Sequence, residues 1–476
     1  MSDILSVGID IGTSTTQLVF SRISMENTVG FFSVPRISIV DKQVIYKSKV
    51  YTTPLMTPLL IDGEKIRELV MAEYDRAGFT PEQVDTGAVI ITGESSRKEN
   101  AAAVLEKLSG LAGEFVVSTA GPDLESIIAG KGSGAFQYSL DNNCVTVNLD
   151  IGGGTTNIAV FDCGEVVGKG CLDLGGRLIR LTPDYHVQQI SPAAELVAGA
   201  LNLQLEPGMQ TNPEELSRIT DEMADLLAQA LSLNPQGTLL RELRTPESSW
   251  LELGSKPISR ICFSGGVADC IQEEPEELNP YGDIGVLLGR SIARGQLARS
   301  IPVLAGSETI RATVVGAGTY TTSISGSTIT YARELFPLKN IPALKLSREE
   351  QEQCFQGNAG ELEDKLRWFM TQSGADQVIL ALPGKRDPDY GELKILSDSL
   401  IRGMEACLST DAPLLVVLEQ DMAKALGLIM ENQLKGRRKV ACIDQIRVEQ
   451  GDYVDMGRPV MDGLVIPVVV KTLLFG

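Results

Sequence analysis

The chain has 476 residues, a formal net charge of −20 and 43% hydrophobic residues. This length exceeds what one hydrophobic core usually sustains, so we expect two to four structural units. The acidic charge argues against nucleic acid or anionic lipid as partners, because both need clustered Lys and Arg. A single histidine excludes multi-histidine metal sites, and eight cysteines without a Cys-x-x-Cys pair favour reduced thiols. No apolar run approaches the ~20 residues that span a bilayer, and the first residues lack the basic region of a secretory signal.

One short pattern occurs twice in the chain. Residues 10–16 read Asp-Ile-Gly-Thr-Ser-Thr-Thr, and residues 150–157 read Asp-Ile-Gly-Gly-Gly-Thr-Thr-Asn. In both copies a carboxylate follows a β-rich run and precedes glycines and hydroxyls, so backbone N–H groups can bind a polyphosphate while the carboxylate holds hydrated Mg²⁺. A single copy is explained as well by an ordinary tight turn. The pair predicts two halves of a protein that face one nucleotide.

The segments that flank the two copies indicate hairpins. Apolar runs precede the loops at 6–9 and 144–149, and others follow them at 17–20 and 158–161. Two such runs around a glycine turn predict a β-hairpin with the loop at its turn. A P-loop or a Rossmann glycine run instead opens a helix, so the hairpins exclude the commonest nucleotide-binding folds.

Between the two loops, strands alternate with helices. We expect a helix to begin at Asp62 and to end at Gly78, because a capping carboxylate precedes the apolar periodicity and a glycine follows it. The other expected elements are a buried strand at 88–92, a helix at 99–108, a short strand at 115–117 and a helix that begins at Pro122. This part of the chain is therefore expected to be a sheet followed by alternating strands and helices.

Downstream of the second loop the pattern becomes more helical. Helices are expected at 192–201 and 213–231, and the second carries an apolar stripe typical of core packing. A strand at 258–263 ends in Ser-Gly-Gly, and the glycines of a helix that starts near Gly282 permit a close crossing with another helix. In the last third, strands at 377–382, 413–418 and 440–443 alternate with helices at 393–407 and 422–433, which indicates a small parallel α/β unit.

The order of these motifs resembles the actin-like ATPase superfamily, which includes heat-shock chaperone ATPases and sugar kinases. The motifs are the two loops, the acidic helix after Pro122, Leu-Gly-Gly at 174–176, Ser-Gly-Gly at 264–266 and the glycine-bearing helix. The resemblance implies an α/β fold class: a two-lobed actin-like ATPase fold of duplicated ribonuclease H-like domains, with an additional C-terminal α/β unit. It implies a first lobe at 1–140 with an inserted subdomain at about 30–115, a second lobe at 141–330 with a helical subdomain at about 183–257, and a C-terminal domain at 331–476.

The same resemblance implies roles for individual residues. Asp10 and Asp150 match the carboxylates that organise Mg²⁺, and Glu125 or Asp123 matches the acidic position that orients the attacking water, with Glu125 preferred. Asn157 stands where many members of the superfamily have Asp. The residues that match the phosphate loops, the ribose neighbour and the adenosine loop, and that would bind ATP, are Gly12, Thr13, Ser14, Thr15, Thr16, Gly152, Gly153, Gly154, Thr155, Thr156, Gly176, Gly265 and Gly266.

A narrower resemblance runs from end to end of the chain. Residues 91–100, 121–130, 148–158, 314–319 and 463–473 are similar to the reactivating factor of ethanolamine ammonia-lyase. That family is an ATP-driven chaperone that binds its client enzyme and lets intact adenosylcobalamin replace a damaged cobalamin. The resemblance implies ATP and Mg²⁺ as cofactors, ethanolamine ammonia-lyase as partner, and a cytoplasmic location, with enclosure in a bacterial microcompartment left open. No cobalamin site is assigned on this chain.

Two alternatives remain open at this point. A small-molecule kinase would need an Asp general base, for which Asp173 and Asp269 are candidates, and a scaffold would hold nucleotide without turnover. For the ATPase we expect Asp150→Asn to keep the fold, as a surface-loop residue, and to lose turnover. The second loop has three glycines where the first has one, so we expect it to tolerate substitution less well.

Overall fold

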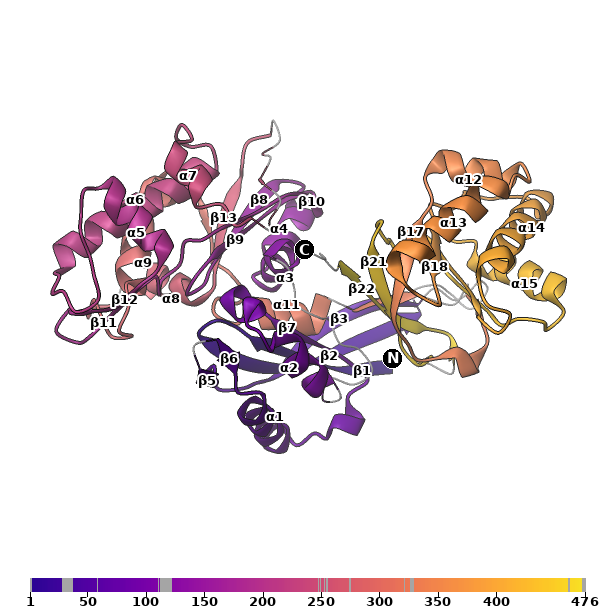
Figure 1. Cartoon of the computed structure of the whole chain (residues 1–476), viewed down its shortest axis with the longest axis horizontal. Coiled ribbons are helices and arrows are strands. Elements are labelled where there is room, and N and C mark those ends of the chain that lie inside the picture. The colour runs from indigo at the N-terminus through magenta and orange to yellow at the C-terminus, as the bar shows by residue number, and fades with distance from the viewer. Residues whose placement is uncertain are drawn as a thin grey trace.

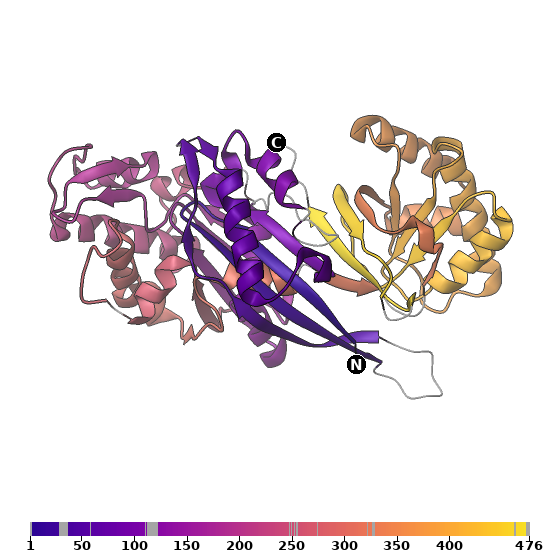
Figure 2. The same ribbon diagram turned by 90° about the horizontal axis from the view of Figure 1, so that it is seen from below.

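The computed structural model describes residues 2–27, 37–57, 59–109, 111, 122–246, 248, 250, 251, 253, 256–273, 275–320, 322–325, 329–460 and 463–472. The strand expected at 115–117 lies outside these residues. The described chain is mixed α/β and forms three main regions, each built around its own sheet (Figure 1). The strands of the first sheet run between the other two regions (Figure 2).

The first sheet has the strand order β3-β2-β1-β7, with β4 paired to β2. Helix α1 begins after Asp62, whose carboxylate accepts a hydrogen bond from Lys65 N at 3.1 Å, and it ends at Gly78 in the left-handed conformation, so both predicted ends are confirmed. The elements of this region are β1 (Ser2–Ile11), β2 (Thr15–Asn27), β3 (Ile37–Lys47), β4 (Tyr51–Thr52), β5 (Leu55–Thr57), β6 (Leu60–Ile61), α1 (Gly63–Ala77), β7 (Thr86–Ile91) and α2 (Ala101–Ser109), with 3-10 turns at Pro81–Gln83 and Gly93–Arg97.

Strands β3 and β7 of the first sheet fall inside the range 30–115 for which the sequence predicts an inserted subdomain. Strand β3 pairs antiparallel with β2, and β7 pairs parallel with β1. Both strands therefore belong to the sheet that carries the first loop, because each forms a backbone ladder with a strand of the first hairpin.

The second sheet repeats this arrangement. Its order is β10-β9-β8-β13-β14, in which β8 runs antiparallel to β9 and parallel to β13. The elements of this region are β8 (Val145–Ile151), β9 (Thr156–Asp162), β10 (Glu165–Leu172), β11 (Ile179–Leu181), β12 (Val187–Ile190), α5 (Pro192–Ala200), α6 (Pro213–Ala230), α7 (Thr238–Glu242), β13 (Arg260–Ser264), α8 (Gly266–Glu273), α9 (Gly285–Arg294), α10 (Gln296–Ser300) and β14 (Val303–Leu304). In both sheets, a β-hairpin with a glycine loop is followed by a parallel strand on its other side.

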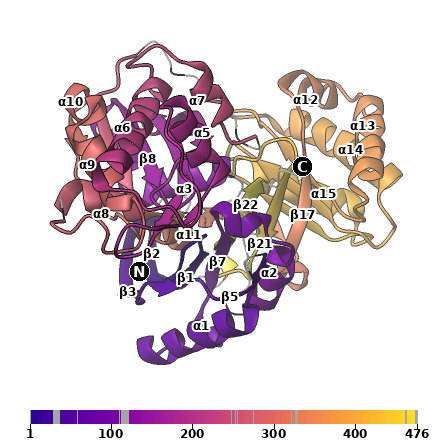
Figure 3. The same ribbon diagram turned by 60° about the vertical axis from the view of Figure 1, so that its left-hand side comes forward.

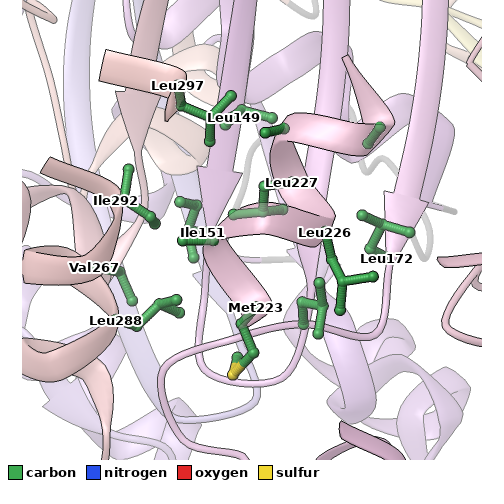
Figure 4. Packing of buried hydrophobic residues seen from close by; sticks show 14 of the residues in the cluster. Leu149, Ile151, Leu172, Met223, Leu226, Leu227, Val267, Leu288, Ile292 and Leu297 are labelled. Atoms are coloured by element: carbon green, nitrogen blue, oxygen red, sulfur yellow. The ribbon is translucent and has the colours of Figure 1, made fainter. Parts of the chain in front are cut away.

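The apolar stripe of α6 packs into the core of this second region. In Figure 4, Met223, Leu226 and Leu227 lie in one cluster with Ile151 and Leu172 of the second sheet and Leu288 of α9. The stripe predicted from the sequence is confirmed, since all six of its members are buried: Leu216, Ile219, Met223, Leu226, Leu227 and Ala230.

Helices α3 (Pro122–Gly132) and α11 (Ala312–Tyr320) cross between the first and second sheets, and α4 (Ala135–Asn142) follows α3 (Figure 1). The crossing brings backbone against backbone. A Cβ added at Gly132 would lie 1.8 Å from the carbonyl oxygen of Ala312, and one at Gly316 would lie 2.0 Å from that of Ile128. Only glycine fits at these two positions, so the crossing is fixed by sequence.

The C-terminal region contains an eight-stranded sheet of order β15-β22-β21-β17-β18-β19-β20-β16. Strands β17 to β20 run parallel, and the predicted α/β unit is confirmed there. The prediction missed the antiparallel strands β15, β22 and β21 that extend this unit. The elements are β15 (Thr322–Ser325), β16 (Thr330–Tyr331), β17 (Leu338–Lys345), α12 (Arg348–Phe355), α13 (Gly360–Ser373), β18 (Ile379–Leu382), α14 (Tyr390–Cys407), β19 (Leu414–Leu418), α15 (Ala423–Leu434), β20 (Val440–Ile443), β21 (Asp452–Met456) and β22 (Ile466–Thr472), with a 3-10 turn at Arg333–Leu335.

Strand β22 joins the C-terminal region to the rest of the molecule. Its Val469 is fully buried in one cluster with Ile90 of β7, Ile128 of α3 and Ala317 of α11. Figure 3 shows β21 and β22 facing the first sheet, with α12, α13 and α14 on the outer side. The C-terminal sheet therefore packs directly on the crossing of α3 and α11.

All eight cysteines are free thiols. Among the described residues, none of the helices combines the length and the apolar character needed to cross a bilayer.

Candidate functional site

Both glycine loops lie at hairpin turns, as predicted. In the first hairpin Ile11 pairs with Thr16, and Gly12 N donates to the carbonyl oxygen of Thr15 at 2.8 Å. In the second hairpin Ile151 pairs with Thr156, and Gly152 N donates to the carbonyl oxygen of Thr155 at 2.9 Å. The two turns are closed by the same hydrogen bond, which leaves the loop residues between the strands to face outward.

The two loops line one cavity of about 340 Å³, here called the two-loop cavity. The predicted site residues that line it are Asp10, Gly12, Thr13, Ser14, Thr15, Glu125, Asp150, Gly152, Gly153, Gly154, Thr155, Gly176, Gly265 and Gly266. The hydroxyls of Thr16 and Thr156 are buried and bonded within the protein, to Thr53 Oγ1 at 3.1 Å and to the carbonyl oxygen of Leu174 at 2.7 Å. These two threonines belong to the strands rather than to the cavity lining.

Asp10 lies near the end of β1 and is only 7% exposed. Thr92, directly after the parallel neighbour β7, donates a hydrogen bond from Oγ1 to Asp10 Oδ1 at 3.0 Å. Burial raises the pKa of Asp10 to about 7; the hydrogen bond from Thr92 lowers it, and the charge of Asp150 raises it further. A charged Asp10 at this buried position therefore costs free energy unless a cation neutralises it.

Asp150 occupies the equivalent place in the second sheet. Ser264 Oγ donates to its Oδ1 at 2.6 Å, and Thr313 Oγ1 at the start of α11 donates to its Oδ2 at 3.3 Å. The residue is 5% exposed, so the expectation of a surface-loop carboxylate is wrong: β8 continues to Ile151 and holds Asp150 in the ladder. Burial raises the pKa of Asp150, while the two hydroxyl donors oppose that rise.

Glu125, and not Asp123, lines the two-loop cavity. Glu125 lies in the first turn of α3, is 8% exposed, and accepts a hydrogen bond from Gly93 N at 3.4 Å. Burial raises the pKa of Glu125 well above its usual range, and the charges of Asp150 and Asp10 add to that rise. Asp123 instead accepts from Ser248 Oγ at 3.0 Å and pairs with Lys169 at 3.1 Å.

The charge of the cavity lining fits a cation-bound polyphosphate better than a bare anion. Its basic and acidic residues are one arginine, Arg177, and the carboxylic acids Asp10, Glu125, Asp150, Asp269 and Asp283. Arg177 Nε is 3.2 Å from Asp283 Oδ2, so its charge is already paired. An anion in such a cavity needs a metal ion between it and the carboxylates.

Two further observations test the fit to this ligand class. Ser14 Oγ and Asn157 Oδ1 are buried side-chain atoms with no hydrogen-bond partner in the described chain, which leaves polar capacity for a ligand or its water. Among the described residues there is no group of three or more His, Cys, Asp or Glu arranged to hold a metal ion. An ion between Asp10 and Asp150 would therefore take its other ligands from water and phosphate oxygens, as Mg²⁺ commonly does.

Sequence reasoning missed the residues that support the carboxylates. Thr92 ends one predicted strand and Ser264 follows another, so their positions at strand ends were a usable signal. Thr313 had no local signal, because it is 163 residues away from Asp150. Asp269, which the sequence offered as a candidate base, lines the cavity together with Arg177, Tyr281 and Asp283, and nothing in the local pattern of these other three distinguishes them.

Comparison with known proteins places this chain among its relatives. The model of the family described as ethanolamine utilisation protein EutA matches residues 2–476. The chain belongs to this family. The ethanolamine ammonia-lyase reactivase EutA of Salmonella typhimurium is 36% identical to this EutA-family chain, over 99% of this chain and 98% of that protein. The reactivase EutA of Escherichia coli is 35% identical, with the same coverage. Among solved structures, the PPX-GPPA enzyme of Aquifex aeolicus is similar at 16% identity and a TM-score of 0.36, covering 67% of this chain and 90% of that one.

Proposed function

We propose that this protein is an ATP-driven reactivating factor for ethanolamine ammonia-lyase. The observation that carries the proposal is the family match over residues 2–476, together with two relatives named as ethanolamine ammonia-lyase reactivases that align over nearly their full lengths. In this role the protein binds a client enzyme whose cobalamin is damaged and promotes its exchange for intact adenosylcobalamin. We place it in the cytoplasm, where it would meet its client free or in a microcompartment.

The two-loop cavity is the proposed ATP site. Backbone N–H groups of the two loops, other than those of Gly12 and Gly152 that close the turns, would bind the phosphates from opposite sheets. Asp10 and Asp150 would hold Mg²⁺, which neutralises charge that develops on the phosphates. Glu125 would accept a hydrogen bond from the attacking water, and so orient it.

The crossing helices supply a route from the ATP site to the rest of the molecule. Thr313 at the start of α11 touches Asp150, and the same helix packs through Ala317 on Ile128 and on Val469 of β22. A change in how the loops approach one another would therefore be felt at the C-terminal sheet. Differential affinity for the client in the ATP and ADP states would make hydrolysis useful.

We propose three units close to the predicted bounds of 1–140, 141–330 and 331–476, with the actin-like ATPase fold in the first two. The repeated sheet order of β3-β2-β1-β7 and β10-β9-β8-β13 supports a duplication. The C-terminal unit would begin before residue 331, since β15 pairs with β22 and β16 pairs with β20.

The deciding experiment is reactivation. Substrate-inactivated ethanolamine ammonia-lyase is incubated with this protein, ATP, Mg²⁺ and free adenosylcobalamin, and deaminase activity is followed. Recovery that requires both this protein and hydrolysable ATP is the expected result. A working ATPase without recovery of deaminase activity would refute the client while leaving the ATP site intact.

One observation supports a small-molecule kinase as the alternative function. Asp269 lines the two-loop cavity, where it would serve as the general base. The other candidate, Asp173, accepts a hydrogen bond from Thr245 Oγ1 at 2.7 Å and does not line the cavity. Release of inorganic phosphate from ATP without any added acceptor would exclude a strict kinase. Tight binding of ATP without release at any client concentration would favour a scaffold instead.

A further inference from the structure

A second cavity lies on the other side of the helix crossing. It has a volume of about 500 Å³, within the range of small-molecule sites. Its walls come from β3 of the first sheet, from the end of α3, from α4, from the loop at 304–308 and from α11. We call it the lysine cavity, because Lys42 and Lys131 are its two basic lining residues. None of its residues lines the two-loop cavity.

The position of Lys42 follows from the packing of β3. Val44, two residues along the same strand, packs on the buried valines Val19, Val314 and Val315. Side chains two residues apart on a strand share a face, so Lys42 extends over the same side of the sheet toward α11. The pairing of β3 with β2 shifts register between Ser24 and Met25, just before this segment. Such an irregularity changes the direction in which the following side chains of β3 extend.

Lys131 reaches the cavity from the opposite wall. It is in the last turn of α3, one residue before the glycine that contacts α11, and its Nζ lies 5.2 Å from the centre of the Phe136 ring. The helix crossing thus sets the backbone position of Lys131, whereas the first sheet sets that of Lys42. The two ammonium groups are held on one cavity by separate rigid elements.

The lining holds two lysines, which are its cations, and two acidic residues. Burial lowers the pKa of Lys42 to about 8, and the nearby charge of Lys131 lowers it further. Burial also lowers the pKa of Lys131. Two acidic residues share the lining: Glu308 pairs with Lys47, and Asp141 accepts a hydrogen bond from Gln137 Nε2 at 2.8 Å. Two partly desolvated ammonium groups that repel one another gain most from a ligand that carries negative charge.

We propose that the lysine cavity binds a small oxyanion of the phosphate class, held between Lys42 and Lys131. The ligand could be free phosphate or the phosphate group of a small monoester, since the cavity is larger than one phosphate ion. A bound oxyanion would tie β3 of the first sheet to the crossing of α3 and α11. The binding does not depend on ATP hydrolysis or on the client.

The test is equilibrium binding by calorimetry at constant ionic strength, with inorganic phosphate in one arm and glycerol phosphate in the other. The variants are Lys42→Met and Lys131→Met, and the matched control is Lys49→Met, an exposed lysine that does not line the cavity. We expect saturable binding of at least one probe, and a loss of about tenfold or more in affinity in each cavity variant but not in the control. Phosphate that binds only in the two-loop cavity would survive both substitutions, and that result would overturn the proposal.

A second measurement on the unaltered protein covers the case in which a variant does not fold. Lysines are acetylated briefly with acetic anhydride near pH 8, with and without phosphate, and quantified by mass spectrometry. We expect phosphate to slow modification of Lys42 and Lys131 severalfold and to leave Lys49 unchanged. Equal rates with and without phosphate at all three lysines would contradict the site.

Discussion

The two glycine loops have the same hairpin geometry, but the protein supports them differently. Side-chain hydroxyls provide most of the support of the first loop: Thr53 Oγ1 and Ser95 Oγ both donate to the carbonyl oxygen of Gly12, at 2.8 and 3.0 Å, beside one backbone hydrogen bond from Thr53 N to Ser14 O at 3.0 Å. Backbone supports the second loop: Gly176 N donates to Gly152 O at 2.9 Å and Arg177 N donates to Gly153 O at 2.7 Å. A loop held by side chains can lose one contact and adjust, whereas a loop packed against other backbone has no such freedom.

The largest effect is expected where backbone packs on the end of the second hairpin. Gly265 has a φ of +84°, and a Cβ there would lie 2.3 Å from the carbonyl oxygen of Ile151. Gly265→Ala should lower the free energy of unfolding by about 3 kcal/mol or more, from backbone strain and overpacking together. Equilibrium unfolding in denaturant measures this free energy. The matched control is Gly266→Ala, whose Cβ would meet no atom within 4 Å; equal stability of the two variants would remove the proposed difference between the loops.

The next effect concerns the buried carboxylate of the second hairpin. Asp150→Asn keeps the shape of the side chain, and an amide can still pair with Ser264 and Thr313, so we expect stability within about 1 kcal/mol of the parent. ATP turnover should fall about 100-fold, because the charge that would hold the metal is lost. Steady-state phosphate release measures this. Asp162→Asn, at the far end of the same hairpin and paired with Lys256 at 2.5 Å, is the control and should keep full turnover. Normal turnover in Asp150→Asn would refute the site.

The hydroxyl support of the first loop predicts a smaller effect. Thr53→Ala removes the hydrogen bond to Gly12 O and the contact with Thr16 Oγ1, and should cost about 1 kcal/mol of stability. The KM for ATP should rise a few fold, since the loop can still be held by Ser95. Thr53→Ser retains the hydroxyl and is expected to restore both values. If Thr53→Ala were as damaging as Gly265→Ala, the first loop would be no more adaptable than the second.

What the sequence predicted well is what depends on near neighbours along the chain. The hairpins follow from apolar runs around glycines, the ends of α1 from Asp62 and Gly78, and the buried face of α6 from its periodicity. What it missed depends on distant pairing. Thr53 meets Gly12 across 41 residues and Thr313 meets Asp150 across 163, so no local pattern could assign either hydroxyl. The antiparallel strands of the C-terminal sheet were missed for the same reason, because β15 finds its partner β22 far along the chain.

The smallest predicted effect tests a place where the two loops approach one another. A Cβ at Gly153 would lie 2.7 Å from Ser14 Oγ of the opposite loop and 3.4 Å from Arg177 Cβ. Gly153→Ala should therefore displace the Ser14 hydroxyl and raise the KM for ATP about threefold. Ser14→Ala removes a hydroxyl that is available to the ligand, and it should raise the KM by less, because the backbone of the loop stays in place.

The double variant separates the two explanations of that loss. If the cost comes from contact between the loops, Ser14→Ala combined with Gly153→Ala should recover most of the affinity, with a coupling energy of about 0.5–1 kcal/mol. If the effects of the two substitutions on the KM simply add, the cost of Gly153→Ala arises within the second loop. It then reflects how closely the backbone of Gly153 approaches the phosphate. A measured coupling would instead mean that the second loop tolerates substitution poorly at Gly153 because the first loop faces it across the cavity.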